Sequence, residues 1–227
     1  MPALRIPLAL VPLAFLLGSC DHFRSFETVC QERVGPTRIT VDTLPVRFET
    51  DLTQSHAELA QKDPSQSNLL TLGLVAAEMK ATLEYATNGI IQRRTGRYCM
   101  RPSVRVTLSY SPMTLFVARE ETQGSCEFEL TMEHELKHVR TFEAFLPDAA
   151  AQIEASLGAE FGNRIQYFPS EAEAAHHVKE ITRDFLGPFV SHNMSKVKAL
   201  QAQVDSPAEY ERIRLARDAC RDESQPR

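Results

Sequence analysis

Alternation of apolar and polar residues defines the clearest predicted element of the chain, a strand at residues 103–110. The apolar side chains at even positions would face one way and the polar ones at odd positions the other, as on a strand with one buried face. Ser111-Pro112 predicts the end of that strand, because proline has no backbone N–H for a ladder. Further extended segments are predicted at residues 37–50, 90–100 and 113–119.

A periodicity of about 3.6 residues marks the helices. Residues 127–146 carry an apolar stripe at helical spacing, and Pro147 predicts the end of this helix. A helix is also predicted at residues 69–86, although Gly73 weakens it and its later part could enter a strand, and Asn88-Gly89 predicts a turn. The remaining predicted helices cover residues 52–61, 148–157, 170–186, 189–204 and the stretch that begins at Asp205-Ser206-Pro207.

These elements indicate an α+β protein with a small N-terminal, mostly antiparallel sheet with helices, then the helix at 127–146, then a mainly helical C-terminal half. The chain has 227 residues, 43% of them hydrophobic, so it can bury a core as one domain. We expect that domain at residues 35–220, followed by a polar tail at 221–227. The formal net charge of -5, with no basic patch standing out in the sequence, argues against nucleic acid as a partner.

Residues 1–19 have the pattern of an export signal, with one charge at Arg5 and an apolar run too short to span a bilayer. The run ends at Leu17-Gly18-Ser19-Cys20, which resembles the lipobox of bacterial lipoproteins, in which the cysteine becomes the lipidated first residue. The alternative is a plain secretory signal with an incidental cysteine. We expect a protein of the bacterial cell envelope, anchored in a membrane through Cys20 and facing the periplasm or the cell exterior, with residues 20–34 as a polar tether.

Four cysteines remain after Cys20, namely Cys30, Cys99, Cys126 and Cys220. An even number in an exported chain predicts two disulfides, although four cysteines allow three pairings. We expect Cys99 to pair with Cys126, tying the strand region to the start of the helix that follows, and Cys30 to pair with Cys220, joining the two ends. Zinc ligation by these cysteines is the weaker interpretation, because no Cys-x-x-Cys occurs.

The most informative motif is His134-Glu135-Leu136-Lys137-His138, within the helix at 127–146. Residues four apart on a helix lie on one face, so the imidazoles of His134 and His138 can reach one metal ion. Neutral imidazoles suit zinc, and Glu135 can serve as a general base beside them. The competing interpretation is an ordinary amphipathic helix, whose apolar stripe lies beside the two histidines.

Strands followed by a His-Glu-x-x-His helix and further helices resemble the zincin group of metallopeptidases. The resemblance implies that His134 and His138 bind zinc and that Glu135 is the general base. It also implies that an upstream strand, here residues 113–119, forms the upper edge of a cleft and pairs with an extended peptide. The order of elements further resembles a family of exported bacterial proteins regarded as zinc peptidases of unknown substrate. The chain departs from metzincins, which have Gly and His after the second motif histidine, and lacks the Asn-Glu-x-x-Ser-Asp of thermolysin-like enzymes.

The motif leaves the third metal ligand open. One group of candidates lies on the helix predicted at 170–186 and comprises Glu171, Glu173, His176 and His177. Glu173 and His177 share a helix face, so that one could bind the metal while the other orients a motif histidine, but an ordinary solvated helix face explains them equally well. Asp205 and Glu209 are a second possibility, for which helix capping is the simpler explanation.

Three functions are consistent with these residues. The first is a membrane-anchored zinc metallopeptidase that acts on peptide or protein substrates, with Glu135 as the base. The second is a non-catalytic envelope lipoprotein that keeps a zincin-like fold for binding or structure, and the third is a purely structural metal site. The intact Glu135 favours the enzyme, because a structural metal has no use for a base. The missing third ligand favours the second function.

Overall fold

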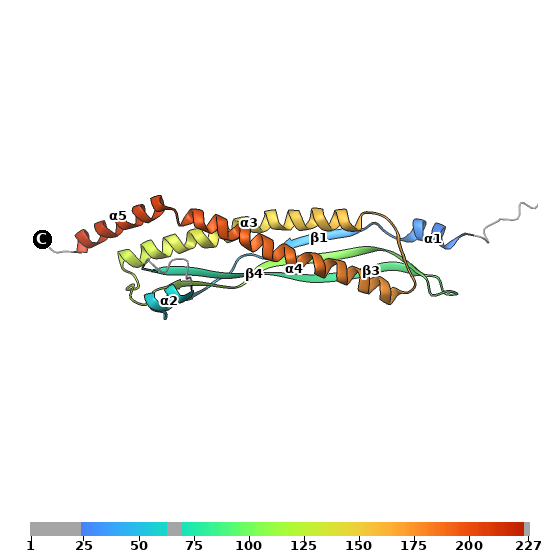
Figure 1. The fold of residues 1–227 in the computed structure, drawn as a ribbon, viewed down its shortest axis with the longest axis horizontal. Coiled ribbons are helices and arrows are strands. Elements are labelled where there is room, and N and C mark those ends of the chain that lie inside the picture. Colours follow the sequence, from blue (N-terminus) through green and yellow to red (C-terminus); the bar gives the residue numbers. More distant parts are fainter. Residues whose placement is uncertain (1–23, 63–69, 225–227) are drawn as a thin grey trace, which may run out of the picture.

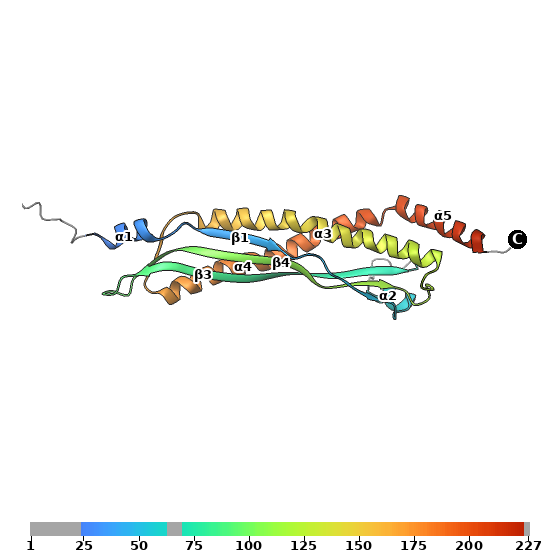
Figure 2. The same ribbon diagram turned by 180° about the vertical axis from the view of Figure 1, so that it is seen from behind.

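The computed structural model describes residues 24–62 and 70–224, so the expected export signal and Cys20 lie outside the described residues. The described chain is elongated, with long helices running along one face of a long sheet (Figure 1). Figure 2 shows these layers from behind, with β3 and β4 in front of α4. The elements are α1 (Phe26–Arg33), β1 (Arg38–Thr43), β2 (Glu49–Asp51), α2 (His56–Lys62), β3 (Gly73–Ile91), β4 (Tyr98–Val117), α3 (Cys126–Phe161), β5 (Gln166–Phe168), α4 (Glu171–Val204) and α5 (Pro207–Ser224).

Strand β4 is the centre of the sheet, and every other described strand pairs with it. β3 runs antiparallel along one edge of β4 for its whole length. The opposite edge is shared by three short strands in line: β5 lies antiparallel to residues 98–100, and β1 and β2 lie parallel to residues 103–108 and 114–116. The α+β class is therefore confirmed, but the expectation of a mostly antiparallel sheet is wrong. The chain passes along one edge of β4 in β1 and β2 before it returns in β3, which makes both of those pairings parallel.

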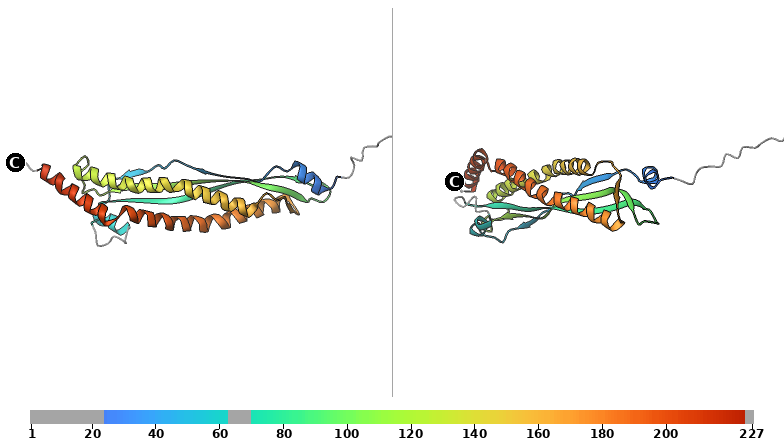
Figure 3. Two further views of the ribbon diagram at one scale, coloured as in Figure 1. Left: turned by 90° about the horizontal axis from the view of Figure 1, so that it is seen from above. Right: turned by 45° about the vertical axis from the view of Figure 1, so that its right-hand side comes forward.

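The core lies between the sheet and the two long helices α3 and α4, which run side by side along one face (Figure 3). Alternate residues of β4 point toward the helices, and Val106 and Leu108 are completely buried. The residues between them face away; Arg105 is exposed and forms an ion pair with Asp42 of β1 at 3.1 Å. The alternation at residues 103–110 thus predicted both the strand and its buried face correctly.

Residues 73–86 of the helix predicted at 69–86 are instead a strand and make up about the first three quarters of β3. Its residues are good helix formers, but their burial alternates with a period of two, as in Met79 (buried) between Glu78 and Lys80 (both exposed). Pairing with β4 outweighs the weak intrinsic helix preference, because it satisfies the backbone and buries the apolar face together. Asn88-Gly89 also lies within β3 and makes no turn.

Prolines interrupt fewer elements than expected. β4 continues past Ser111-Pro112, because the register shifts there by one residue and the two residues form a bulge opposite Glu78, where proline needs no ladder hydrogen bond. Helix α3 continues through Pro147 to Phe161, and α4 continues through Pro188 to Val204. A proline inside a helix costs about 3 kcal/mol, and burial of the apolar residues on both sides of each proline offsets that cost.

The structure contains two disulfides, as expected, but both pairings differ from the expected ones. Cys30 is joined to Cys99, and Cys126 is joined to Cys220. Cys99 lies at the start of β4 and Cys126 follows its far end, so about 60 Å of strand separates them, whereas a disulfide needs Cα atoms within about 7 Å. Two disulfides are typical of proteins outside the reducing cytoplasm.

The N-terminal segment is a fixed part of the fold from residue 26 onward rather than a tether up to residue 34. Ser25 caps α1 by accepting a hydrogen bond from the backbone N–H of Thr28. Cys30 is completely buried and covalently bound to β4. At the other end, α5 extends to Ser224, so part of the expected polar tail is helical. Within residues 24–62 and 70–224, no helix combines the length and the apolar character needed to cross a membrane.

Disulfide mapping checks this topology. Proteolysis of the non-reduced protein should release peptides that link Cys30 to Cys99 and Cys126 to Cys220, because only these pairs are adjacent in the fold. Mass spectrometry before and after reduction identifies them. A peptide that links Cys99 to Cys126 would contradict the position of the start of α3, which follows the far end of β4.

Candidate metal centre

The His-Glu-x-x-His motif lies in the third and fourth turns of α3. This helix starts at the Ser125 cap, whose hydroxyl accepts a hydrogen bond from the backbone N–H of Phe128. His134, Glu135 and His138 are all buried, with 7%, 4% and 9% of their surface exposed. Buried polar side chains need partners, and those of His134 and His138 come from the end of α4, the start of α5 and the junction between them.

Asp205, the residue between α4 and α5, completes a cluster with the two histidines. Its Oδ1 atom lies 3.2 Å from His134 Nε2 and 3.1 Å from His138 Nε2, and the two Nε2 atoms are 3.3 Å apart. A tetrahedral zinc ion with bonds of about 2.1 Å separates its ligand atoms by about 3.4 Å, so this triangle is close to the size that such an ion requires. The three residues form a group that could hold a metal ion.

Neighbouring side chains hold both imidazoles with Nε2 toward this triangle. The amide nitrogen of Gln201 donates to the carbonyl oxygen of His138 at 3.1 Å, which leaves its Oε1 to accept from His138 Nδ1 at 2.6 Å. The Nδ1 atom of His134 lies 3.5 Å from Glu209 Oε1, a longer contact of the same kind. With the proton on Nδ1, each Nε2 carries a lone pair. Two lone pairs and a carboxylate that point at one another repel unless a proton or a cation lies between them, so the residues fit a metal ion.

The charges of the cluster favour a cation. Burial lowers the pKa of His138, but the hydrogen bond with Asp205 and the negative charge of Glu135 outweigh it and raise the pKa above its ordinary value. Burial likewise opposes ionisation of Asp205. When a proton rather than a metal lies on the Nε2 atoms, hydrogen bonds from His134 and His138, with one from Tyr210, hold the pKa of Asp205 well below the ordinary value. The carboxylate is therefore ionised at neutral pH, and the cluster attracts positive charge.

Glu135 lies beside the cluster and differs from Asp205 in its protonation. Burial raises its pKa to about 7, although the nearby His138 and His134 lower it in part. A carboxyl group with a pKa near neutrality can both accept and release a proton. Its position depends on Gly73 at the start of β3, because a Cβ at residue 73 would lie 2.6 Å from the Cγ of Glu135. The glycine that weakened the predicted helix is thus required for the close approach of β3 to the base.

The cluster opens into a cavity of about 520 Å³. One wall is the chain that leads into β3, another is the motif face of α3, and the third is α5. The apolar part of the lining comes largely from β3 and its approach together with Ile213 of α5, and the polar part includes Thr71, whose buried hydroxyl has no partner among the described residues. The lining residues beyond the metal cluster and Glu135 are Leu70, Thr71, Leu72, Gly73, Leu74, Val75, Thr131, Gln201, Tyr210, Ile213, Arg214, Arg217, Asp218 and Arg221.

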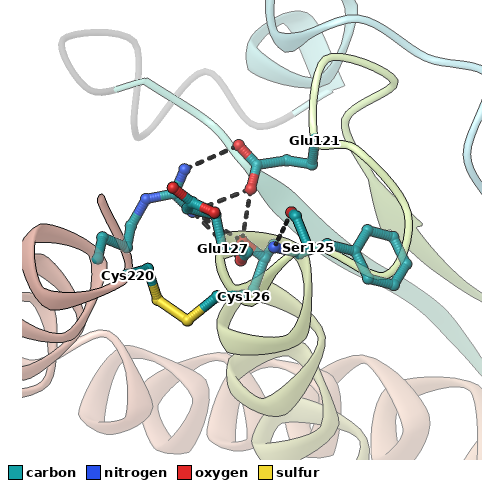
Figure 4. The surroundings of a disulfide bond; sticks show 8 residues. Glu121, Ser125, Cys126, Glu127 and Cys220 are labelled. Carbon is teal, nitrogen blue, oxygen red and sulfur yellow. Dashed lines mark hydrogen bonds and ion pairs between the residues drawn. A yellow bond between two sulfur atoms is a disulfide. The ribbon is translucent and has the colours of Figure 1, made fainter. Parts of the chain in front are cut away.

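Helix α5 is fastened to the first turns of α3, and this fixes Asp205. The disulfide between Cys126 and Cys220 joins the N-terminal end of α3 to the far end of α5, next to Glu121 (Figure 4). Arg217 binds Glu121 through two parallel contacts of 2.9 Å, and both side chains are largely buried. Glu209 binds Lys137 of α3 at 2.6 Å. These contacts hold the junction of α4 and α5 over the motif histidines.

Glu209 is placed to orient the imidazole of His134 rather than to bind a metal itself. Hydrogen bonds from Arg212 lower its pKa to about 2, and Lys137 and His134 add to the effect against the opposing influence of burial. Its oxygens are engaged by these cations, and Asp205 is the carboxylate that reaches both Nε2 atoms.

The other candidate ligands and the expected edge strand lie elsewhere. Glu173 is in the first turn of α4 and the ring of His177 packs against Phe168 at 5.2 Å. Gln201 contacts the metal cluster, and His177 precedes it by 24 residues on the same helix, which is about 36 Å. Glu173 and His177 therefore cannot reach the cluster, and Glu171 and His176 are excluded for the same reason. Residues 113–117 belong to the central strand β4, and residues 114–116 have strand partners on both sides; β3 is the strand beside the cavity.

Comparison with known proteins found no match: no family model, no curated protein and no solved structure is significantly similar to this chain. The interpretation of the site therefore depends on its own geometry.

Zinc affinity tests the ligand set. Asp205→Ala and His138→Ala should each weaken zinc binding more than about 100-fold, since loss of a residue that merely orients a ligand already costs 10- to 100-fold. Competition with a chromophoric chelator measures the affinity. Two matched controls are Asp218→Ala, which removes a carboxylate from the same cavity, and His177→Ala, which removes a distant imidazole. Unchanged affinity in Asp205→Ala, or an equal loss in His177→Ala, would contradict the assignment.

Proposed function

We propose that this protein is an exported zinc-dependent peptidase of the bacterial cell envelope, anchored through Cys20. The observation that carries the proposal is the combination of the His134–His138–Asp205 triangle with a buried carboxyl group, Glu135, whose pKa is near neutrality, at the base of one cavity. Two imidazoles and a carboxylate are a ligand set of catalytic zinc sites, which keep a fourth position open. A structural site would have four protein ligands and no need of a base.

The metal is assigned as zinc from the chemistry of the ligands. Imidazole nitrogen and carboxylate oxygen suit zinc, and the ligand atoms are spaced for tetrahedral coordination. Zinc held by these residues would supply a Lewis acid that polarises a carbonyl group and lowers the pKa of water.

Glu135 is proposed to move the proton during hydrolysis. Its carboxylate would accept a proton from the attacking water and deliver it to the nitrogen of the leaving amine. Burial raises the pKa of Glu135, which makes the carboxylate a stronger proton acceptor than an exposed one. The short approach to Gly73 holds the side chain in place, so little reorganisation is needed between the two steps.

A peptide is the substrate class that the cavity fits best. Among the described strands, β3 pairs only with β4, so none of these strands occupies its second edge, and the residues that lead into it line the cavity. An extended peptide could add to this edge by main-chain hydrogen bonds, which recognise any sequence, while the leucines and Ile213 would receive an apolar side chain. The hydroxyl of Tyr210, which lies against Asp205 in the same cavity, is placed to donate to a substrate oxygen when it turns from the carboxylate.

Replacement of Glu135 by Gln separates catalysis from metal binding. Glu135→Gln keeps the size of the side chain and leaves the three ligands intact, so zinc binding should be retained while peptide hydrolysis falls about 100- to 10,000-fold. The assay is the release of new amino termini from a mixture of unfolded proteins, with and without a chelator. The control is Glu133→Gln, an exposed neighbour on the same helix turn, which should keep its activity.

If chelator-sensitive hydrolysis occurs at the same rate in Glu135→Gln and wild type, the proposed base is wrong. If wild-type protein that contains zinc hydrolyses no peptide in any mixture, the peptidase proposal itself fails.

A further inference from the structure

The turn that joins β3 to β4 is a firmly built hairpin tip. Gln92 donates its backbone N–H to Arg97 at 2.7 Å and accepts from the N–H of Gly96 at 2.9 Å. Gly96 has a φ of 78°, a conformation that favours glycine. Because the backbone of the turn is fixed, the directions of its Cα–Cβ bonds are fixed as well, and this tip is the end of the longest pair of strands in the described fold.

The exposed side chains at this tip are basic and apolar. Ile91 is 52% exposed, and Arg93 and Arg94 are exposed with no ion-pair partner among the described residues. Arg97 differs, since it binds Glu27 at 3.2 Å and lies over the ring of Phe26. The four arginines of α5 and Arg105 of β4 bind carboxylates, whereas Arg93 and Arg94 are two adjacent arginines without such a partner among the described residues.

The fold adds further positive charge to this end. The segments that meet here are residues 24–34, 88–101 and 163–173, and together they carry seven arginines and four glutamates. The chain as a whole has a net charge of -5, so the remainder is more acidic still. The sequence alone shows no basic patch because these arginines come from three separate segments. An acidic body with one basic end orients that end toward an anionic surface.

The same end carries the start of the described chain. Helix α1 lies beside the hairpin, and the Cys30–Cys99 disulfide and the ion pair between Glu27 and Arg97 fix it there (Figure 1). Arg24 follows the expected lipid site at Cys20 by four residues, which can span at most about 14 Å. A lipid on Cys20 would therefore hold this end of the molecule, and no other, close to a bilayer.

We propose that the β3–β4 hairpin tip is a docking surface for anionic phospholipid headgroups, with Arg93 and Arg94 binding the phosphates and Ile91 entering the interface. Guanidinium groups bind phosphate through paired hydrogen bonds, and an exposed apolar residue between them adds burial at the headgroup level. The basic tip would add electrostatic attraction to the attachment that a lipid on Cys20 gives, and it would set the orientation of the molecule at the bilayer.

Docking at this tip places the metal centre far from the membrane. Gly73, which touches Glu135, is at one end of β3 and Ile91 is at the other, a separation of about 60 Å along the strand. The cavity would then face substrates in the space beyond the bilayer rather than lipid-embedded peptides.

A tryptophan reporter measures docking directly, because the natural chain contains no tryptophan. The full chain with Ile91→Trp is added to vesicles of phosphatidylcholine, with or without about one third phosphatidylglycerol, that carry lipids brominated near the headgroup. The indole should be quenched in the anionic vesicles and not in the neutral ones. When Arg93→Gln and Arg94→Gln are combined with Ile91→Trp, the ratio of docked to undocked protein should fall about 25-fold, which is about fivefold for each arginine. High salt should also lower this ratio, because it screens the attraction between arginine and phosphate.

Two controls keep the test specific. Arg47→Gln with Arg140→Gln removes the same charge from exposed arginines that also have no ion-pair partner among the described residues, and should leave quenching unchanged. Leu215→Trp places the reporter on exposed α5 and should show no quenching. The proposal would be overturned by equal quenching at residues 91 and 215, or by an equal loss of quenching in the Arg93/Arg94 and the Arg47/Arg140 double variants. Binding to anionic polysaccharide but not to anionic vesicles would overturn it as well. The readout involves neither metal nor hydrolysis, so it stands apart from the test of the peptidase.

Discussion

The carboxylate of Asp205 is the group on which the site depends. It lies at the junction of α4 and α5 and is shared between the Nε2 atoms of His134 and His138, which are 71 and 67 residues earlier in the chain, respectively. Two buried imidazoles with lone pairs turned toward each other are unfavourable by themselves, and a buried carboxylate is costly without partners. A divalent cation bound between them would remove the repulsion between the lone pairs and would balance the charge of the carboxylate. The charge of the cluster thus links the C-terminal helices to the helix that carries the motif.

Much of the remaining architecture serves to hold that junction in place. The Cys126–Cys220 disulfide, the Arg217–Glu121 pair and the Lys137–Glu209 pair all join α5 to the first half of α3 or the loop before it. They act at several points along α5, so the helix cannot pivot about one contact, and the distance from Asp205 to the histidines is set by rigid elements. The long β3–β4 pair performs the other task, since it brings Gly73 against Glu135 while its far end lies beside α1.

The sequence predicted the parts of this site that depend on local spacing. Two histidines four apart with a glutamate between them share a helix face wherever that helix packs, and the alternation in β4 showed its buried side in the same way. Ser170 and Asp205 were also identified as helix boundaries, but capping gave no indication that Asp205 reaches the histidines. The third ligand depends on how a 34-residue helix returns along the sheet, and the early candidate Glu173 failed because a helix of that length carries its two ends far apart.

The other predictions that were wrong also concern features set by long-range packing. Residues 73–86 prefer a helix locally, and only pairing along β4 makes them a strand. Pro112 and Pro147 are tolerated because a bulge and a packed helix face accommodate them. The disulfide pairings followed from the positions of β4 and α3, which no local pattern encodes.

The central claim is that one metal ion is held by two imidazoles and the Asp205 carboxylate, and X-ray absorption at the zinc edge tests it most directly. The account predicts about one zinc per chain, with two imidazole nitrogens and oxygen ligands at about 2.0–2.2 Å and no sulfur. In Asp205→Ala the imidazole contribution should persist in whatever zinc remains bound, while one oxygen is lost or replaced by water. A sulfur ligand, a third imidazole, or a spectrum identical in wild type and Asp205→Ala at matched zinc content would contradict it.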